Sequence, residues 1–225
     1  MCGRITLSAN LTEILARFEL TKTVPELEWK PLYNGAPGKQ IPVVLSSSPD
    51  TLSVAKWGLL PSWAKDEKIG YKLINARAEG IAEKPAFRTA FQKGQRCWVV
   101  VDGFYEWKTL PNRKQPYRIK MADNKLFAMA GLWETYEKGP KPVITFSILT
   151  TTPNALLKTM HDRMPVILPR DREKDWLRPD LTTEQIQAFL IPYAGDNLQG
   201  YPVSIGVNNP TNNAPALLDE VQPLP

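Results

Sequence analysis

The sequence predicts an α+β fold in which a largely antiparallel sheet closes into a barrel-like core with short helices on its flanks. Several strand-like runs follow one another without helices between them, whereas a doubly wound fold alternates strand and helix. Neither a Gly-x-Gly-x-x-Gly nor a Walker-type sequence is present, which disfavours the nucleotide-binding folds that carry them. No linker or internal repeat divides the chain, so we expect a single domain over residues 1–225.

The first element is a short helix. Asn10 is an N-capping residue, and it precedes Leu11, Ile14, Leu15 and Phe18 at the i, i+3, i+4, i+7 spacing of a helix with one apolar face. Further helices are predicted over residues 85–93, 153–160 and 182–190, the last opened by the capping-box pattern Thr182 to Gln185. Runs of β-branched and aromatic residues predict strands near residues 41–45, 52–59, 97–107, 116–121, 126–134, 143–150 and 201–207.

Composition narrows the classes of function. The net charge of +5 permits a polyanionic partner, and no stretch approaches the roughly 20 consecutive apolar residues of a membrane span. No signal peptide is visible, and the free thiols Cys2 and Cys97 suit a reducing compartment, so we expect a cytoplasmic protein. One histidine and two cysteines cannot build a Cys/His zinc site, which leaves only a carboxylate site for Mg or Mn open. We expect chemistry without a metal or a cofactor.

Cys2 is the most informative position. If Met1 is removed, Cys2 carries a free α-amine, whose unperturbed pKa is about 7.7–8.0, beside its thiol. This 1,2-aminothiol can condense with an aldehyde to a Schiff base, and the thiol can then close a five-membered thiazolidine ring. The residue could instead be an acyl-transfer nucleophile that uses its own amine as base, or a frayed terminus without a role.

Polar residues within strand-like segments are further candidates. Asn75 and Arg77 lie two apart, so an extended segment points both side chains to one face, where an amide could orient a carbonyl or imine and a guanidinium could hold a phosphate. Asn75 could equally cap or turn the chain. Glu106 follows an apolar run and is flanked by aromatic residues, which indicates either a carboxylate paired with a buried arginine or one with a raised pKa for proton transfer.

His161 is the one histidine, and it has the side chain whose unperturbed pKa best suits proton transfer at neutral pH. It could also be only a cation after a helix.

The segment from Lys56 to Arg96 has nine basic and four acidic residues interleaved with aromatic residues. A binding site for single-stranded nucleic acid needs cations that hold the phosphates and aromatic rings on which the bases stack. Most of these aromatic residues, however, belong to a core. Trp63, in a polar loop, is the best candidate for an exposed stacking residue.

Six segments together resemble one family, the SRAP (SOS response-associated peptidase) family, over essentially the whole chain. They are Met1-Cys2-Gly3-Arg4, Tyr33-Asn34-Gly35-Ala36-Pro37, Trp57-Gly58-Leu59, Asn75-Ala76-Arg77-Ala78-Glu79, Gly103-Phe104-Tyr105-Glu106-Trp107 and His161-Asp162-Arg163-Met164-Pro165.

This resemblance implies capture of abasic sites in single-stranded DNA as a thiazolidine crosslink during the DNA damage (SOS) response. It also implies release of the protein's own first residue and a weak lyase activity at the Schiff-base stage. We expect a monomer.

The resemblance also assigns roles to residues. Cys2 is the nucleophile, Asn75 positions it and the sugar, Glu106 moves protons, and His161 binds the sugar oxygen or phosphate and helps ring opening. The expected DNA contacts are Gly3, Arg4, Asn34, Pro37, Trp63, Arg77, Thr151 and Thr152, together with either Lys84 or Arg88.

Two other classes remain open. One is a glutamine amidotransferase, which also begins with Met-Cys-Gly, but neither its extended glutamine-binding motifs nor a second synthase domain is found in this chain. The other is a reversible single-stranded DNA-binding module whose Cys2 forms no covalent bond.

Overall fold

A closed ring of five strands forms the core of the computed structural model, which describes residues 2–224. Within that part of the chain, neighbouring strands of the ring are antiparallel except for one parallel contact, in which Thr145 lies opposite Lys56 and closes the barrel. The ring consists, in order, of β5 (Ser48–Trp57), β4 (Gln40–Leu45), β7 (Arg96–Val101), β10 (Phe127–Tyr136) and β11 (Val143–Thr151).

Three short strands extend the ring. β2 (Lys22–Thr23) pairs with β5, while β12 (Met164–Pro165) and β6 (Asn75–Arg77) both pair with β11.

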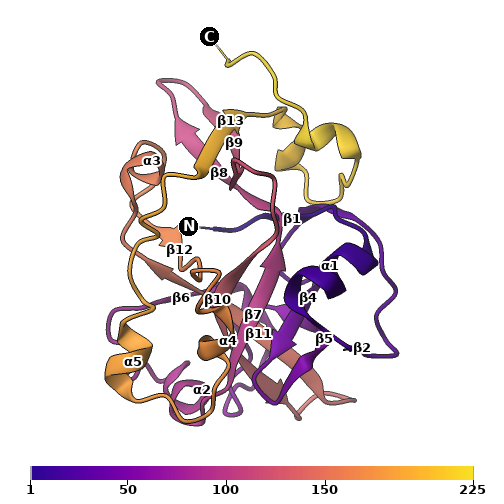
Figure 1. Ribbon diagram of the computed structural model, residues 1–225, viewed down its shortest axis with the longest axis vertical. Helices are drawn as coiled ribbons and strands as arrows, with labels where there is room; N and C mark the ends of the chain where they lie inside the picture. The colour runs from indigo at the N-terminus through magenta and orange to yellow at the C-terminus, as the bar shows by residue number, and fades with distance from the viewer. Residues whose placement is uncertain (1, 225) are drawn as a thin grey trace.

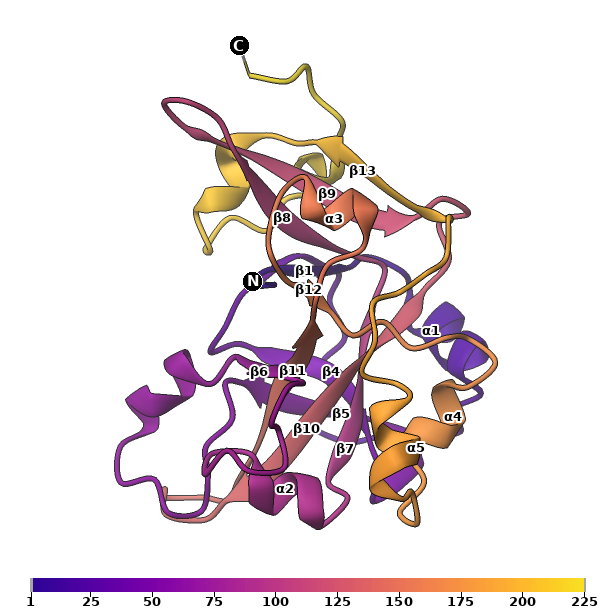
Figure 2. The same ribbon diagram turned by 90° about the vertical axis from the view of Figure 1, so that its left-hand side faces the viewer.

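A second sheet lies against one end of the barrel. Its strand order is β13 (Leu198–Pro202), β9 (Lys114–Met121), β8 (Gly103–Thr109), β1 (Ile5–Leu7) and β3 (Leu32–Gly35). Figures 1 and 2 show β8, β9 and β13 above the barrel, with β1 between them and the barrel strands. The N-terminal strand therefore lies at the junction of the two sheets.

Short helices cover the outside of the barrel, namely α1 (Leu11–Phe18), α2 (Arg88–Gln92), α4 (Glu173–Trp176) and α5 (Thr183–Gln187), whereas α3 (Ala155–Lys158) lies beside the second sheet. The caps predicted for two helices are confirmed. Asn10 accepts a hydrogen bond from the Glu13 N–H at 2.9 Å, and Thr182 and Gln185 form the capping box. The described residues also contain three 3₁₀ helices: η1 (Glu67–Lys72), η2 (Ile205–Asn208) and η3 (Pro215–Leu218).

The alternation of side chains along β7 explains why this strand is apolar on both faces. Trp98 and Val100 point outward into the cluster beneath the helices, while Cys97, Val99 and Val101 point into the barrel interior. Burial of both faces makes the sequence read as a continuous apolar run. The α+β class and the barrel-like sheet are confirmed.

Two predicted strands differ from the structure. The run 97–107 is not one strand, because β7 ends at Val101, the chain passes Asp102, and β8 begins at Gly103 in the other sheet. The predicted strand 201–207 is β13 followed by η2, which Ser204 caps. The predicted helices 85–93, 153–160 and 182–190 exist as the shorter α2, α3 and α5.

Within residues 2–224, no helix combines the length and apolar character that crossing a bilayer requires.

Candidate active site

The pairing of β1 with β8 brings Glu106 to the start of the chain. Ile5 lies opposite Phe104 and Thr6 opposite Gly103, and the Tyr105 N–H donates to the Arg4 carbonyl at 2.9 Å. Continued by two residues, this register sets Glu106 opposite Gly3, next to Cys2. The local reason is that antiparallel strands fix which residues face each other once one pair is formed.

The Cys2 side chain is fully buried in the apolar cluster that also contains Ile5 and Phe104. Burial raises the pKa of the Cys2 thiol far above its usual range, and the charge of Glu106 raises it further, while a hydrogen bond from the Arg4 backbone acts in the opposite direction. The thiol is therefore neutral at physiological pH. It becomes a nucleophile only if a nearby base takes its proton.

Asn75 holds the backbone of Cys2. Its Nδ2 donates to the Cys2 carbonyl at 2.7 Å, and Asn75 is itself held by β6, where it lies opposite Ile148 of β11. The Asn75 Oδ1 atom is buried and has no hydrogen-bond partner among the described residues. An unused acceptor beside Cys2 can receive a hydrogen bond from an amine, an iminium or a sugar hydroxyl.

Glu106 is 2% exposed, and burial raises its pKa to about 7. This agrees with the second of the two sequence-based interpretations, a carboxyl group prepared for proton transfer. At neutral pH both its protonated and ionised forms are populated, so it can donate a proton in one step and accept one in the next.

His161 lies in the turn after α3 and is partly exposed. Its Nδ1 atom accepts from the Arg163 N–H at 3.0 Å and lies 2.7 Å from an oxygen of Asp162. Burial lowers the pKa of His161, and the charge of Asp162 counteracts this in part. The same carboxylate adds to the effect of burial on Glu106, which links the histidine turn to the glutamate strand.

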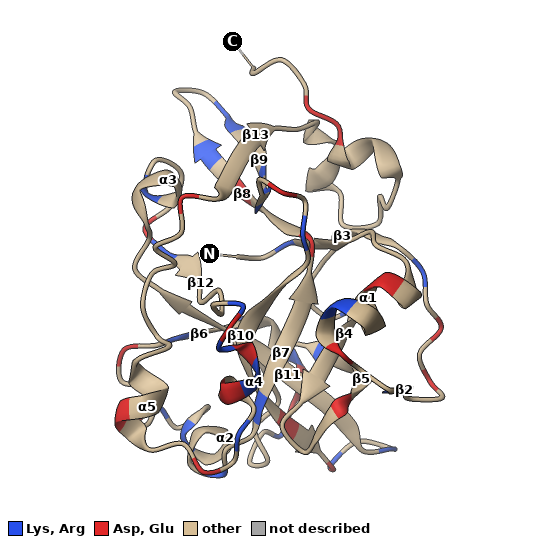
Figure 3. Ribbon diagram, in the orientation of Figure 1, with Lys and Arg blue, Asp and Glu red and all other residues tan. Residues whose placement is uncertain are grey.

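Exposed basic residues and one exposed indole lie on β6, on α2 and in the segment between β5 and η1. Arg77 is exposed on β6, and the Lys84 Nζ donates to its carbonyl at 3.1 Å. Trp63 is 49% exposed, as predicted, and its Nε1 donates to the Pro85 carbonyl at 3.2 Å. Arg88 is exposed at the start of α2. In Figure 3, basic residues mark both β6 and the β8 to β9 hairpin, below and above β12.

Some predicted DNA contacts have other tasks in the structure. Asn34 is fully buried, and its amide donates to the carbonyls of Val207, Asn209 and Asn212. Thr151 is also buried and donates to the Leu190 carbonyl at 3.0 Å. The expectation that these two side chains line a groove is therefore wrong, because both are enclosed and hydrogen-bonded within the protein.

The remaining expected contacts are accessible to different degrees. Arg4 donates to Asn34 and to the Val207 carbonyl, both at 2.7 Å, and is half-buried. Gly3 and Pro37 are partly exposed, and Thr152 is exposed. DNA contact by these four residues stays a prediction.

Sequence reasoning missed the ion pair that joins two of the motifs. Arg163 donates from both terminal nitrogens to the Glu79 carboxylate at 2.8 Å and also donates to the Thr150 carbonyl at 2.5 Å. Both residues belong to segments with polar motifs, but nothing in a single sequence shows that they pair. The bond fixes the His161 turn to the segment that follows Asn75.

Known proteins are similar to this chain over most of its length. A family model described as SOS response associated peptidase (SRAP) matches residues 1–210. The chain belongs to the SRAP family. YoaM of Bacillus subtilis (strain 168), named an abasic site processing protein, is 47% identical over 223 residues, which are 97% of this chain and 98% of YoaM.

Two further proteins share the name printed for YoaM or the fold of this chain. HMCES of Xenopus tropicalis, also named an abasic site processing protein, is 32% identical over 84% of this chain and 65% of its own length. A crystal structure of a protein from Bacteroides thetaiotaomicron superimposes with a TM-score of 0.89 at 30% identity, covering 98% of this chain and all of that one. The family resemblance found in the sequence is confirmed.

Proposed function

We propose that this SRAP protein processes abasic sites in single-stranded DNA by binding the open-chain sugar aldehyde covalently through Cys2. The names of the relatives support abasic-site processing. One observation carries the chemistry: a buried thiol, held by its own carbonyl through Asn75, lies beside a glutamate whose pKa burial raises to about 7.

The reaction needs the free amine of Cys2, so Met1 must first be removed. The amine then attacks the aldehyde carbon to give a carbinolamine. Protonated Glu106 donates its proton to the carbinolamine hydroxyl, which leaves as water, and an iminium ion remains. The Glu106 carboxylate next takes the thiol proton, and sulfur attacks the iminium carbon to close the thiazolidine ring. One water is lost in total, and Glu106 ends protonated as it began.

The surrounding residues serve the same reaction. The Asn75 Oδ1 atom can accept a hydrogen bond from the developing iminium, and His161 is placed to contact the sugar oxygen or phosphate and assist ring opening. Exposed Arg77, with Lys84 or Arg88, holds flanking phosphates, while Trp63 offers a ring face to an adjacent base. The weak lyase activity and the release of the first residue belong to the same proposal, as does a role in the DNA damage response.

Intact-mass measurement tests the proposal. The purified protein is incubated with a single-stranded oligonucleotide that bears one abasic site, and parallel samples contain the duplex copy and the same strand with a normal base. We expect protein without Met1 that gains the mass of the abasic strand minus one water. Retained Met1 with no adduct contradicts covalent capture and favours the reversible binding module, whose affinity is strongly salt-dependent and indifferent to the lesion.

A further inference from the structure

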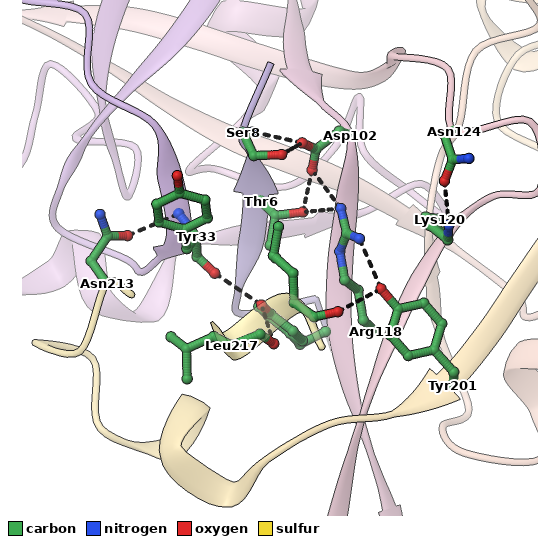
Figure 4. Close-up of polar contacts among 12 residues, drawn as sticks. Thr6, Ser8, Tyr33, Asp102, Arg118, Lys120, Asn124, Tyr201, Asn213 and Leu217 are labelled. Carbon is green, nitrogen blue, oxygen red and sulfur yellow. Dashed lines mark hydrogen bonds and ion pairs between the residues drawn. The ribbon is translucent and has the colours of Figure 1, made fainter. Parts of the chain in front are cut away.

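A buried polar network lies behind the start of the chain, on residues that the reaction above does not use. Asp102 connects the barrel strand β7 to β8, and its carboxylate is enclosed, with the Asp102 side chain 9% exposed. It accepts hydrogen bonds from the Thr6 hydroxyl, from the Ser8 N–H at 2.6 Å and from the Ser8 hydroxyl at 2.6 Å. Figure 4 shows this carboxylate between Thr6, Ser8 and Arg118.

Arg118 supplies the opposite charge. Its Nη2 donates to Asp102 at 3.0 Å, and its Nη1 donates to the Tyr201 hydroxyl at 2.9 Å, which in turn donates to the Leu218 carbonyl. The network thus reaches from β1 through β9 to β13 and the C-terminal segment. A buried carboxylate with this many donors is a rigid anchor, because removing any one donor leaves part of the hydrogen-bonding capacity of a buried charge unfilled.

The strand that Asp102 holds needs such an anchor. β1 is three residues long, and chain termini fray unless they are tied down. The pairing of β1 with β8 joins Ile5 to Phe104 and Thr6 to Gly103 and is extended by backbone hydrogen bonds from Tyr105 to Arg4 and from Asp102 to Thr6. On its other edge β1 pairs with β3 at Ile5 and Leu7, so its backbone contacts remain few. A slip of one residue in this pairing moves Cys2 by about 3.4 Å and turns its side chain to the other face.

Gly103 shows how closely the two strands are joined. A Cβ atom added there lies 2.9 Å from the Thr6 hydroxyl and 2.8 Å from the Ile119 carbonyl. Only glycine at position 103 leaves room for the Thr6 hydroxyl, which lies opposite it and bonds to the neighbouring Asp102.

We propose that Asp102 is a positioning residue, which sets the register of β1 against β8 and thereby holds Cys2 beside Glu106. The proposal rests on the function proposed above. Asp102 touches neither Cys2 nor the aldehyde; it acts through Thr6 and Ser8, with Arg118 as its counter-charge. Its removal lowers the rate of ring formation more than the affinity for DNA, because the phosphate contacts proposed for Arg77 and for Lys84 or Arg88 lie on other segments.

A second buried ion pair provides a matched control. Arg17 on α1 bonds to Glu173 on α4 at 2.9 and 3.0 Å, with side chains 13% and 5% exposed, among the helices on the outside of the barrel. Asp102→Asn and Glu173→Gln both remove one buried carboxylate charge at nearly constant volume, so they differ chiefly in which elements they release.

The crosslinking rate at saturating abasic single-stranded DNA is measured for both variants, with noncovalent affinity measured on an undamaged strand. We expect Asp102→Asn to slow crosslinking at least tenfold, while the affinity for DNA changes less than twofold. The pH midpoint of the crosslinking rate should fall, because water that reaches Glu106 reduces the burial that raises its pKa. Glu173→Gln keeps the wild-type rate and midpoint. Equal slowing in the two variants, or a wild-type rate in folded Asp102→Asn, overturns the proposal.

Two further measurements keep the proposal falsifiable. If Asp102→Asn does not fold, Thr6→Val, which removes one donor and leaves the ion pair, decides: a severalfold slower rate supports positioning and an unchanged rate overturns it. Amide hydrogen exchange at Tyr105, whose N–H bonds to the Arg4 carbonyl, reports the register without DNA. Faster exchange in Thr6→Val supports the proposal and unchanged protection contradicts it. A wild-type protein that forms no adduct refutes the proposed function instead.

Discussion

The two cysteines occupy regions that differ in one respect. Both thiols are fully buried, and burial raises the pKa of both. Cys97 points into the barrel interior, packed against Val99 and against Gly131, whose added Cβ would lie 2.7 Å from its sulfur. Cys2 lies where the second sheet meets the barrel, and there Asn75 and Glu106 converge on it. A thiol that is only buried, such as Cys97, is unreactive. The proposed reaction at Cys2 also needs the proton acceptor Glu106 beside the buried thiol.

Exchange of each cysteine for alanine tests this contrast most directly. Cys2→Ala is expected to abolish the covalent adduct while weaker noncovalent binding to single-stranded DNA persists, because the phosphate contacts remain. Cys97→Ala should keep the adduct at the wild-type rate and lose about 1 kcal/mol of stability from the core. Denaturing gel electrophoresis after incubation with abasic DNA measures the covalent adduct in both variants. A heat-stable adduct in Cys2→Ala contradicts the thiazolidine chemistry.

The comparison extends to two buried glutamates. Glu134 on β10 is 4% exposed, and burial raises its pKa too, but it lies on the barrel away from Cys2. Glu106→Gln is expected to slow both formation and reversal of the crosslink by about 10²–10⁴, the range for loss of a general acid or base. Glu134→Gln should leave both rates unchanged. Single-turnover kinetics decide, and unchanged rates in Glu106→Gln mean that Glu106 is only structural.

Glu106 also makes stability depend on pH. Its folded-state pKa of about 7 lies above the ordinary value of 4.5, so the folded protein binds more protons than the unfolded chain between these values, and stability falls as pH rises through this window. Glu106→Gln removes the loss. At pH 8 the variant should exceed the wild type by up to about 3 kcal/mol more than it does at pH 4. Urea unfolding at both pH values measures this, and a pH-independent difference contradicts the raised pKa.

The smallest expected effect concerns the exposed cations. Arg77→Ala should weaken binding of single-stranded DNA severalfold and reduce the slope of log affinity against log salt by roughly 1, because one fewer counterion is displaced. Lys22→Ala is the matched control, since Lys22 lies on β2 at the opposite side of Figure 1 and pairs with Asp50. An unaltered slope in Arg77→Ala contradicts a contact between Arg77 and a DNA phosphate.

Local patterns in the sequence sufficed for most helices and strands, but not for their pairings, and the roles indicated for Cys2 and Glu106 stay predictions. Asn10 and Thr182 predict the starts of their helices correctly, because an N-cap bonds to a residue only three positions later in the sequence. Asp102 and Gly103 are a turn signal within an apolar run, and periodicity alone does not show that the chain changes sheets there. Asn34 was expected at a groove because the sequence does not reveal the carbonyls of the C-terminal segment that enclose it.

The proposed reaction at Cys2 requires β6 to have paired with β11 during folding. Asn75 reaches the Cys2 carbonyl from β6, which is held against Ile148, and Glu106 comes from β8. During synthesis Cys2 emerges first and these partners much later, and contacts between residues so distant in sequence form slowly. The nascent end therefore has neither base nor anchor. On the proposed mechanism, an unfolded chain can still condense with the aldehyde, but without Glu106 and Asn75 beside Cys2, so the rate of adduct formation distinguishes native from unfolded molecules.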